Sequence, residues 1–244
     1  MSIPSPQQPH EPVRAGGGSP ARPGWPEIAV GLVGMVAATA VLPFFGPWGL
    51  QLDDVTYGLV VAAWSGVAGL AGFGVAALLR IRSLGAFNVR GATWRWLLAG
   101  LAGGVLALLV KAGLTWAVAS VFGYSSDPQG TYYDAAGGST LSLILTFLFL
   151  AVLTPIGEEF LFRGVLANAL LRYGPVVGIV SSSVVFALFH GINIVLPAAI
   201  VVGIIAGELM RRSGSIWPAV LVHAVNNAAL PILVMLTGVS GPPA

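Results

Sequence analysis

The chain has 244 residues, of which 56% are hydrophobic and only 8% are charged. A soluble domain carries about 25% charged residues, so this chain lacks the polar groups that would cover a water-facing surface. The pI is about 9.3, but the arginines lie between apolar stretches, where the positive-inside rule explains them. We therefore expect the lipid bilayer as a partner and no nucleic acid. The absence of cysteine excludes disulfides, thiolate metal ligands and a cysteine nucleophile.

Residues 1–24 are rich in proline, glycine and polar residues, which predicts a disordered cytoplasmic tail. The apolar stretches that follow predict an all-α, polytopic transmembrane helix bundle of seven or eight spans in residues 25–244, because a helix needs about 20 apolar residues to cross the hydrocarbon core. The predicted spans are 28–45, 55–79, 96–122, 140–171, 175–190, 194–210 and 216–239. The last one counts twice if Pro231 divides it. Residues 123–139 are expected to form a loop.

The loop charges predict an orientation. Arginines occur before the first span and in the loops at 80–95, 172 and 211–212, whereas Asp53, Asp54, Asp127 and Asp134 occur in the loops between them. Arginine marks the cytoplasmic face, so we expect a multi-pass protein of the plasma membrane with a cytoplasmic N-terminus.

Glycines recur at close helical spacing, which lets two helix backbones approach each other. We expect these glycines to pack helices of one chain together rather than to form a dimer face; they are Gly66, Gly69 and Gly72, Gly100 and Gly104, and Gly203 and Gly207.

Two adjacent carboxylates and an arginine interrupt the apolar stretch 140–171. An ionisable side chain at the centre of a membrane helix costs about 2.5–3.5 kcal/mol even on insertion scales. Glu159 and Arg163 are four residues apart on one helix face, which predicts an ion pair. Glu158 then points elsewhere, and a carboxylate in a site of low dielectric suits a general base or acid. The alternative is that all three charges lie among the lipid headgroups.

Three further polar residues lie within apolar helices. His190 ends the stretch that contains Phe186, where it could cap a backbone carbonyl. His223 and Asn227 share one helix face, where they could either join helices by hydrogen bonds or stabilise an oxyanion. With Glu158 they put a base, two imidazoles and an amide on three helices, which favours a hydrolytic site.

These residues resemble the three motifs of the CAAX-protease and bacteriocin-processing (CPBP, or ABI) family, which includes the type II CAAX prenyl endopeptidases. The motifs are Glu158-Glu159-x-x-x-Arg163, Phe186-x-x-x-His190 and His223-x-x-x-Asn227, and the segment 213–219 is similar to the one that leads into the third motif. The resemblance covers about residues 140–230, the expected catalytic core.

The resemblance implies an intramembrane endopeptidase. Glu158 would activate a water molecule, His190 would help to position it, and His223 and Asn227 would form the oxyanion hole. The supporting residues would be Glu159, Arg163 and Phe186. Family members are also described as metalloproteases, so zinc held by Glu158, His190 and His223 is the alternative. We expect no cofactor, because the chain lacks an H-E-x-x-H motif.

Two other functions remain open. Intramembrane Glu, His and Asn can form a proton or ion relay in a transporter, although the chain lacks the internal repeats of many transporters; Glu208 would join such a relay or pair with Arg211 and Arg212. A non-catalytic bacteriocin-immunity protein is the other alternative. The expected partner of an enzyme is a membrane-associated peptide or protein substrate, prenylated or not.

Overall fold

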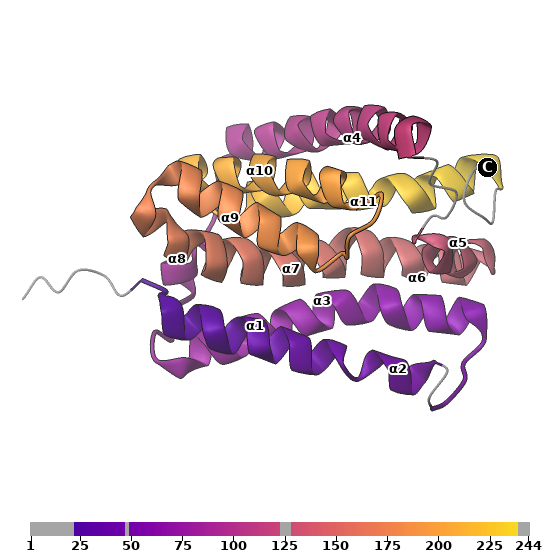
Figure 1. The fold of residues 1–244 in the computed structure, drawn as a ribbon, viewed down its shortest axis with the longest axis horizontal. Helices are drawn as coiled ribbons and strands as arrows, with labels where there is room; N and C mark the ends of the chain where they lie inside the picture. The colour runs from indigo at the N-terminus through magenta and orange to yellow at the C-terminus, as the bar shows by residue number, and fades with distance from the viewer. Residues whose placement is uncertain (1–21, 47–48, 123–127, 239–244) are drawn as a thin grey trace, which may run out of the picture.

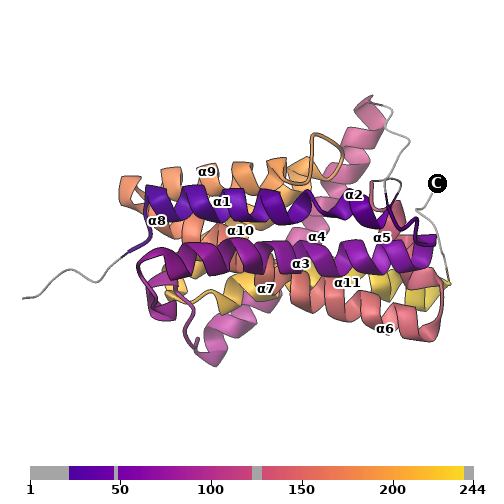
Figure 2. The same ribbon diagram turned by 90° about the horizontal axis from the view of Figure 1, so that it is seen from below.

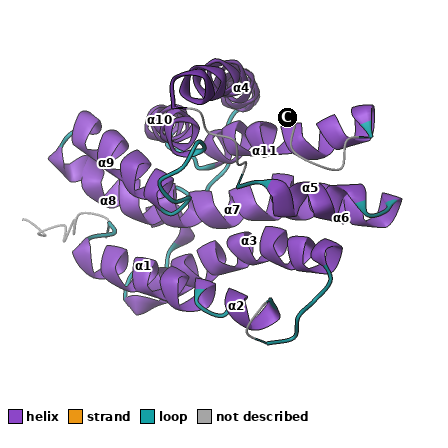
Figure 3. Cartoon of the chain, turned by 45° about the vertical axis from the view of Figure 1, so that its right-hand side comes forward, coloured by secondary structure: helices purple, strands orange, loops and turns teal. Residues whose placement is uncertain are grey.

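A computed structural model describes residues 22–46, 49–122 and 128–238. All regular elements in these ranges are helical (Figures 1 and 3). The helices are α1 (Trp25–Thr39), α2 (Leu42–Phe45), α3 (Asp54–Leu79), the 3-10 helix η1 (Leu84–Phe87), α4 (Trp94–Phe122), α5 (Gly130–Gly137), α6 (Thr140–Leu148), α7 (Thr154–Glu159), α8 (Asn168–Leu170), the 3-10 helix η4 (Leu171–Tyr173), α9 (Pro175–Leu188), α10 (Leu196–Ser213) and α11 (Trp217–Thr237). The predicted all-α, polytopic helix bundle is confirmed.

Five segments in the described ranges are long and apolar enough to cross a membrane: Trp25–Phe45, Asp54–Leu79, Trp94–Val118, Thr140–Tyr173 and Trp217–Thr237. The other two predicted spans form a hairpin. Helix α9 has 14 residues, and the last turns of α10 carry Glu208, Arg211 and Arg212. The turn of this hairpin lies within the length of the bundle rather than at its far end (Figures 1 and 2).

The segment Thr140–Tyr173 runs through the middle of the bundle. It packs against α3 on one side and against α9 and α11 on the other, while α4 lies outermost on α10 and α11 (Figure 1). Two π-helical segments, Phe149–Leu153 and Phe160–Ala167, flank α7, whose two carboxylates are buried. Such π-bulges occur frequently at functional sites.

The first π-helical segment has a consequence for hydrogen bonding. In its register the N–H of Thr154 donates to the carbonyl of Phe149. The next donor in that register would be residue 155, which is proline and has no N–H. The carbonyl of Leu150 therefore lacks its π-helical donor, and it needs one from another helix.

One expectation about the elements needs correction, and two of the predicted spans are defined more closely. Residues 130–137 of the expected loop form α5, because Tyr133, Ala135 and Ala136 are buried inside the bundle. The first span is broken between α1 and α2, next to Pro43, whose ring cannot continue an α-helix. Helix α11 continues through Pro231 as one helix. Residues 1–21 of the predicted tail, and Asp127, lie outside the described residues.

The expected role of the glycines within the chain is confirmed where α3 meets α7. A Cβ added at Gly69 would lie 2.5 Å from the carbonyl carbon of Gly157, and one added at Gly157 would lie 2.0 Å from the carbonyl oxygen of Gly66. No side chain fits between these backbones. The close approach brings Ser65 of α3 beside Glu158 of α7.

Candidate active site

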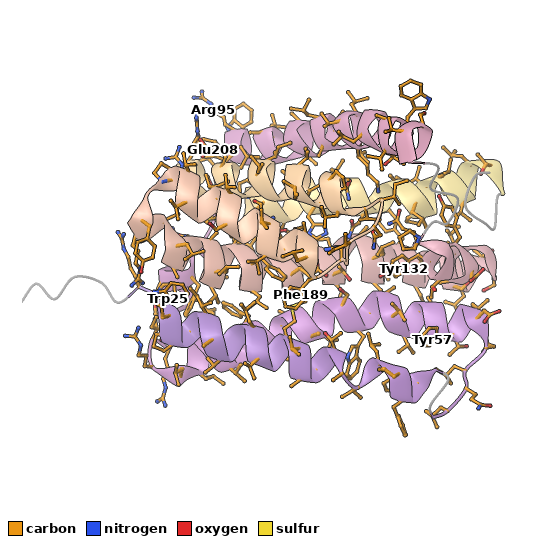
Figure 4. The ribbon with its side chains drawn as sticks, in the orientation of Figure 1. Trp25, Tyr57, Arg95, Tyr132, Phe189 and Glu208 are labelled. Carbon is orange, nitrogen blue, oxygen red and sulfur yellow. The ribbon has the colours of Figure 1, made fainter. Side chains whose placement is uncertain are left out.

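One cavity of about 290 Å³ is lined by all four predicted catalytic residues, Glu158, His190, His223 and Asn227. They reach it from α7, from the α9–α10 turn and from α11. Tyr132 and Phe189 also line the cavity, and both lie between the helices in the middle of Figure 4. The polar residues that the sequence scatters over three segments therefore meet in one place.

Glu158 is 3% exposed, and its two carboxylate oxygens have different surroundings. Ser65 Oγ donates a hydrogen bond to Oε1. Among the described residues, Oε2 has no hydrogen-bond partner, and His223 Nε2 lies 3.9 Å away. That distance is too long for a direct hydrogen bond and suits a bridging molecule. One oxygen is thus fixed, and the other is available.

Glu159 is fully buried and forms two contacts. Its Oε2 lies 3.1 Å from Arg163 Nε, which is the expected ion pair, although the angle is too poor for a hydrogen bond. Its Oε1 accepts a hydrogen bond from His223 Nδ1 at 2.9 Å. The sequence did not predict this second contact. It fixes the imidazole of His223 so that Nε2 faces Glu158.

Phe186 is the packing centre of the site. Its ring contacts both imidazoles, at centroid distances of 4.8 Å to His190 and 5.5 Å to His223. Arg163 Cζ lies over the same ring at 4.3 Å, which is a cation–π geometry. This contact stabilises a guanidinium that is otherwise poorly hydrogen-bonded.

His190 is half-buried at the end of α9. Its Nδ1 lies 3.0 Å from the carbonyl oxygen of Phe186, and because a carbonyl only accepts, Nδ1 carries the proton. In the neutral ring Nε2 is then an acceptor. His190 therefore does cap a backbone carbonyl, and it also presents an acceptor atom at the cavity.

Asn227 supplies the donor that Leu150 lacks. Its Nδ2 donates to the carbonyl of Leu150 at 3.0 Å, and its Oδ1 accepts from Asn226 Nδ2 at 3.1 Å. Both ends of the amide are fixed. One N–H of the Asn227 amide group remains for a ligand in the cavity.

Sequence reasoning missed several lining residues, among them Ser65, Lys111, Tyr132 and Asn226. Ser65 has one signal in the sequence: a small polar residue beside the glycines that let α3 and α7 touch. Tyr132 lies in the segment expected to be a loop. Burial raises the pKa of Tyr132 to about 12, so it lines the cavity as a neutral hydroxyl.

The alternative zinc set does not assemble. In the described ranges, no three His, Asp or Glu side chains are arranged to hold a metal ion together. The Nδ1 atoms of His190 and His223 bond to Phe186 and Glu159, which leaves both Nε2 atoms for a ligand. Glu158, His190 and His223 thus line one cavity but do not form a metal-binding cluster in the described ranges, and the expectation that the reaction needs no cofactor stays a prediction.

Comparison with known protein families matches residues 140–229 to the family described as Rce1-like type II CAAX prenyl endopeptidase. The chain is similar to this family over these 90 of its 244 residues. The resemblance inferred from the motifs is thus confirmed for this segment, and the chain is a multi-pass membrane protein whose residues 140–229 match a protease family. Comparison with curated proteins and with solved structures gave no match.

The match to the type II CAAX endopeptidase family begins at α6 and ends within α11. It contains every residue that the motifs singled out. Ser65, Lys111 and Tyr132 lie outside the matched segment, on α3, α4 and α5, and contribute to the same cavity. The N-terminal helices therefore complete the wall of a site whose motif residues all come from the C-terminal half.

Proposed function

We propose that the chain hydrolyses a peptide bond of a membrane-associated peptide or precursor, using a water molecule that Glu158 activates. The observation that carries the proposal is the asymmetry of the Glu158 carboxylate. Ser65 fixes Oε1, while Oε2 is unpartnered among the described residues and belongs to a cavity shared with two imidazoles and an amide.

In the first step, Glu158 Oε2 takes a proton from the water, and the resulting hydroxide oxygen bonds to the carbonyl carbon of the scissile peptide. His190 Nε2, an acceptor in the neutral ring, holds the second hydrogen of that water. A base and a positioning acceptor on opposite sides of one water orient its lone pair toward the carbonyl carbon.

The tetrahedral intermediate carries negative charge on the former carbonyl oxygen. The free N–H of the Asn227 amide donates to this oxyanion, and so does His223 Nε2 when the ring carries both protons. Glu159, held at 2.9 Å from His223 Nδ1, keeps the ring in place and balances its charge. Glu158 then returns its proton to the amine as the C–N bond breaks, which leaves a carboxylic acid and an amine.

Arg163 and Phe186 act on the site through other residues. Arg163 balances the charge of Glu159, and the Phe186 ring contacts both the guanidinium and His190. Neither needs to touch a substrate to affect the reaction.

We also propose that the bundle end where α1 begins faces the cytoplasm, in the plasma membrane. All described arginines except the buried Arg163 lie at this end, whereas Asp53, Asp54 and Asp134 lie toward the other (Figure 1). This asymmetry is what the positive-inside rule describes.

The decisive experiment is cleavage of internally quenched peptides, prenylated and unprenylated, by the full chain purified in detergent. Glu158→Gln should lower kcat by about 10²-fold or more, because general acid–base catalysis contributes on the order of 10²–10⁴-fold. The matched control is Glu208→Gln, which removes a carboxylate that does not line the cavity and should leave cleavage unchanged.

Cleavage that survives Glu158→Gln would overturn the role of Glu158. If no peptide is cleaved and proteoliposomes instead show a proton leak that depends on Glu158, the chain transports ions and the hydrolytic proposal fails. A single cleaved bond, identified by mass spectrometry, would define the substrate class.

A further inference from the structure

We propose that a second cavity, at the arginine-rich end of the bundle, binds the phosphate of an anionic phospholipid. This cavity, called here the arginine cavity, has a volume of about 530 Å³ and is lined by three arginines, Arg22, Arg90 and Arg211. None of its lining residues also lines the cavity of the candidate active site. The proposal does not depend on the proposed hydrolytic function.

The three guanidinium groups come from separate parts of the chain: Arg22 precedes α1, Arg90 lies between α3 and α4, and Arg211 is in the last turn of α10. No acidic side chain is among the described residues that line the cavity. Arg211 is partly neutralised by Glu208, to which it donates at 2.7 and 2.8 Å. Arg22 and Arg90 have no acidic partner within the described ranges, so the cavity carries net positive charge.

Arg90 is held in position rather than extended freely from the surface. Its Nε donates to the carbonyl of Gly214, and its backbone carbonyl accepts from Ser215 Oγ at 2.6 Å. The neighbouring carbonyl of Asn88 accepts from the backbone N–H of Ile216 at 2.9 Å. The segment 88–90 is therefore tied to the turn between α10 and α11, with the Arg90 terminal amino groups at the cavity.

Gly214 is a requirement of this arrangement. Its φ of +64° favours glycine, and a Cβ there would lie 2.6 Å from the terminal nitrogen of Arg90. A side chain at this position would both strain the turn and displace Arg90. A surface arginine without a binding role needs no such support.

The ligand follows from charge, location and shape. Arginine binds phosphate oxygens through two parallel N–H donors. The cavity lies among the arginines of this bundle end, and phospholipid headgroups lie at the ends of a membrane-spanning bundle. Its wall also contains the apolar Ile81 and Leu171, which suit a glycerol backbone and the first acyl carbons better than a free ion.

The test measures lipid retention by the full chain, purified in neutral detergent, with native mass spectrometry. The probes are phosphatidylglycerol, phosphatidylcholine and inorganic phosphate. Phosphatidylglycerol should be retained in preference to phosphatidylcholine, and Arg22→Gln and Arg90→Gln should each lower that preference by about tenfold, the value of a charged hydrogen bond. The matched controls are Arg82→Gln and Arg95→Gln, which remove the same charge near the same end without lining the cavity.

An equal loss in the control variants would show that only the general surface charge matters and would overturn the site. If inorganic phosphate displaces phosphatidylglycerol at similar concentrations, the cavity binds a free phosphate ion and not a lipid, and the proposal is wrong. Equal retention of both lipids would also contradict the proposal. Arg22 makes no hydrogen bond or ion pair within the described residues, so Arg22→Gln tests the site even if Arg90→Gln fails to fold.

Discussion

Glutamate meets arginine in two very different surroundings along this chain. Glu159 and Arg163 lie in the core with 0% of either side chain exposed. Glu208 lies at the end of α10, 32% exposed, with Arg211 and Arg212 beside it. Both groups sit at helical i,i+3 or i,i+4 spacing, so the local sequence pattern is the same.

The hydrogen-bond geometry is better at the exposed site. Arg211 binds Glu208 with two short bonds, and Arg212 adds a third. The core pair has a single contact at 3.1 Å with a poor angle, supplemented by His223 and by the ring of Phe186. The hydrogen-bond geometry of an ion pair is therefore a poor guide to the stability that is lost when one partner is removed. Water replaces a lost partner at the surface, whereas nothing replaces it in the core.

Arg163→Met should have the largest effect on stability. It removes the charge that balances Glu159 in the core, and breaking one side of a buried pair costs about 3–5 kcal/mol. The free energy of unfolding in mixed micelles, measured by denaturant titration, should fall by that amount. A Cβ at Gly203 would lie 2.7 Å from the Cβ of Ser183 and 3.0 Å from the terminal nitrogen of Arg163, so Gly203→Ala should produce a smaller loss in the same direction.

The double variant Glu159→Gln/Arg163→Met is the control for that experiment. It removes both charges and should recover much of the lost stability while remaining inactive, because His223 loses its carboxylate partner. If the single and double variants are equally unstable, the loss comes from packing against Phe186 and not from an unpaired charge.

Ser65→Ala should have a smaller effect, and on catalysis rather than on stability. The substitution frees Glu158 Oε1 and lets the carboxylate rotate away from its productive position. We expect kcat to fall by about tenfold with little change in KM, since hydrogen bonds to charged groups are worth about 1.5–3 kcal/mol. Ser65→Thr keeps the hydroxyl and should retain most of the activity.

The matched control for Ser65 is Ser182→Ala. Ser182 is also a buried serine in a helix, but within the part of the chain that the structure describes its hydroxyl donates only to the carbonyl of Ile179 in its own helix. A loss of kcat in Ser182→Ala as large as in Ser65→Ala would mean that both act through helix packing. A rise in KM instead of a fall in kcat would mean that Ser65 contributes to substrate binding and not to the orientation of the base Glu158.

The core cluster also shows what the sequence can and cannot predict. The spacing of Glu159 and Arg163 sufficed to predict their ion pair, because four residues make one helical turn. The cost of charge in an apolar stretch marked Glu158, His190, His223 and Asn227 as the residues to examine. Spacing along one helix cannot predict which atoms meet across helices.

The bond between His223 and Glu159 depends on how α11 packs against α7, and the one between Ser65 and Glu158 depends on the contact of α3 with α7. The helix α5 was missed for the same reason. Its glycines and polar residues favour a loop locally, and only burial of Tyr133 and Ala136 against neighbouring helices stabilises it. Residue spacing predicted the contacts within one helix, whereas the contacts between helices and the formation of α5 depend on tertiary packing.

Glu208→Gln should have the smallest effect of all. The substitution removes the carboxylate that Arg211 and Arg212 share. Because water and salt already screen these charges, the unfolding midpoint should change by less than about 3 °C. The difference from the unmodified chain should vanish as salt is raised to about 1 M, where the screening length falls to about 3 Å. Differential scanning fluorimetry at low and high salt measures both values, with Arg163→Met as the reference whose loss salt should not reverse. A salt-independent loss in Glu208→Gln as large as that of Arg163→Met would mean that the two sites differ in exposure but not in energy, and the contrast between them would fail.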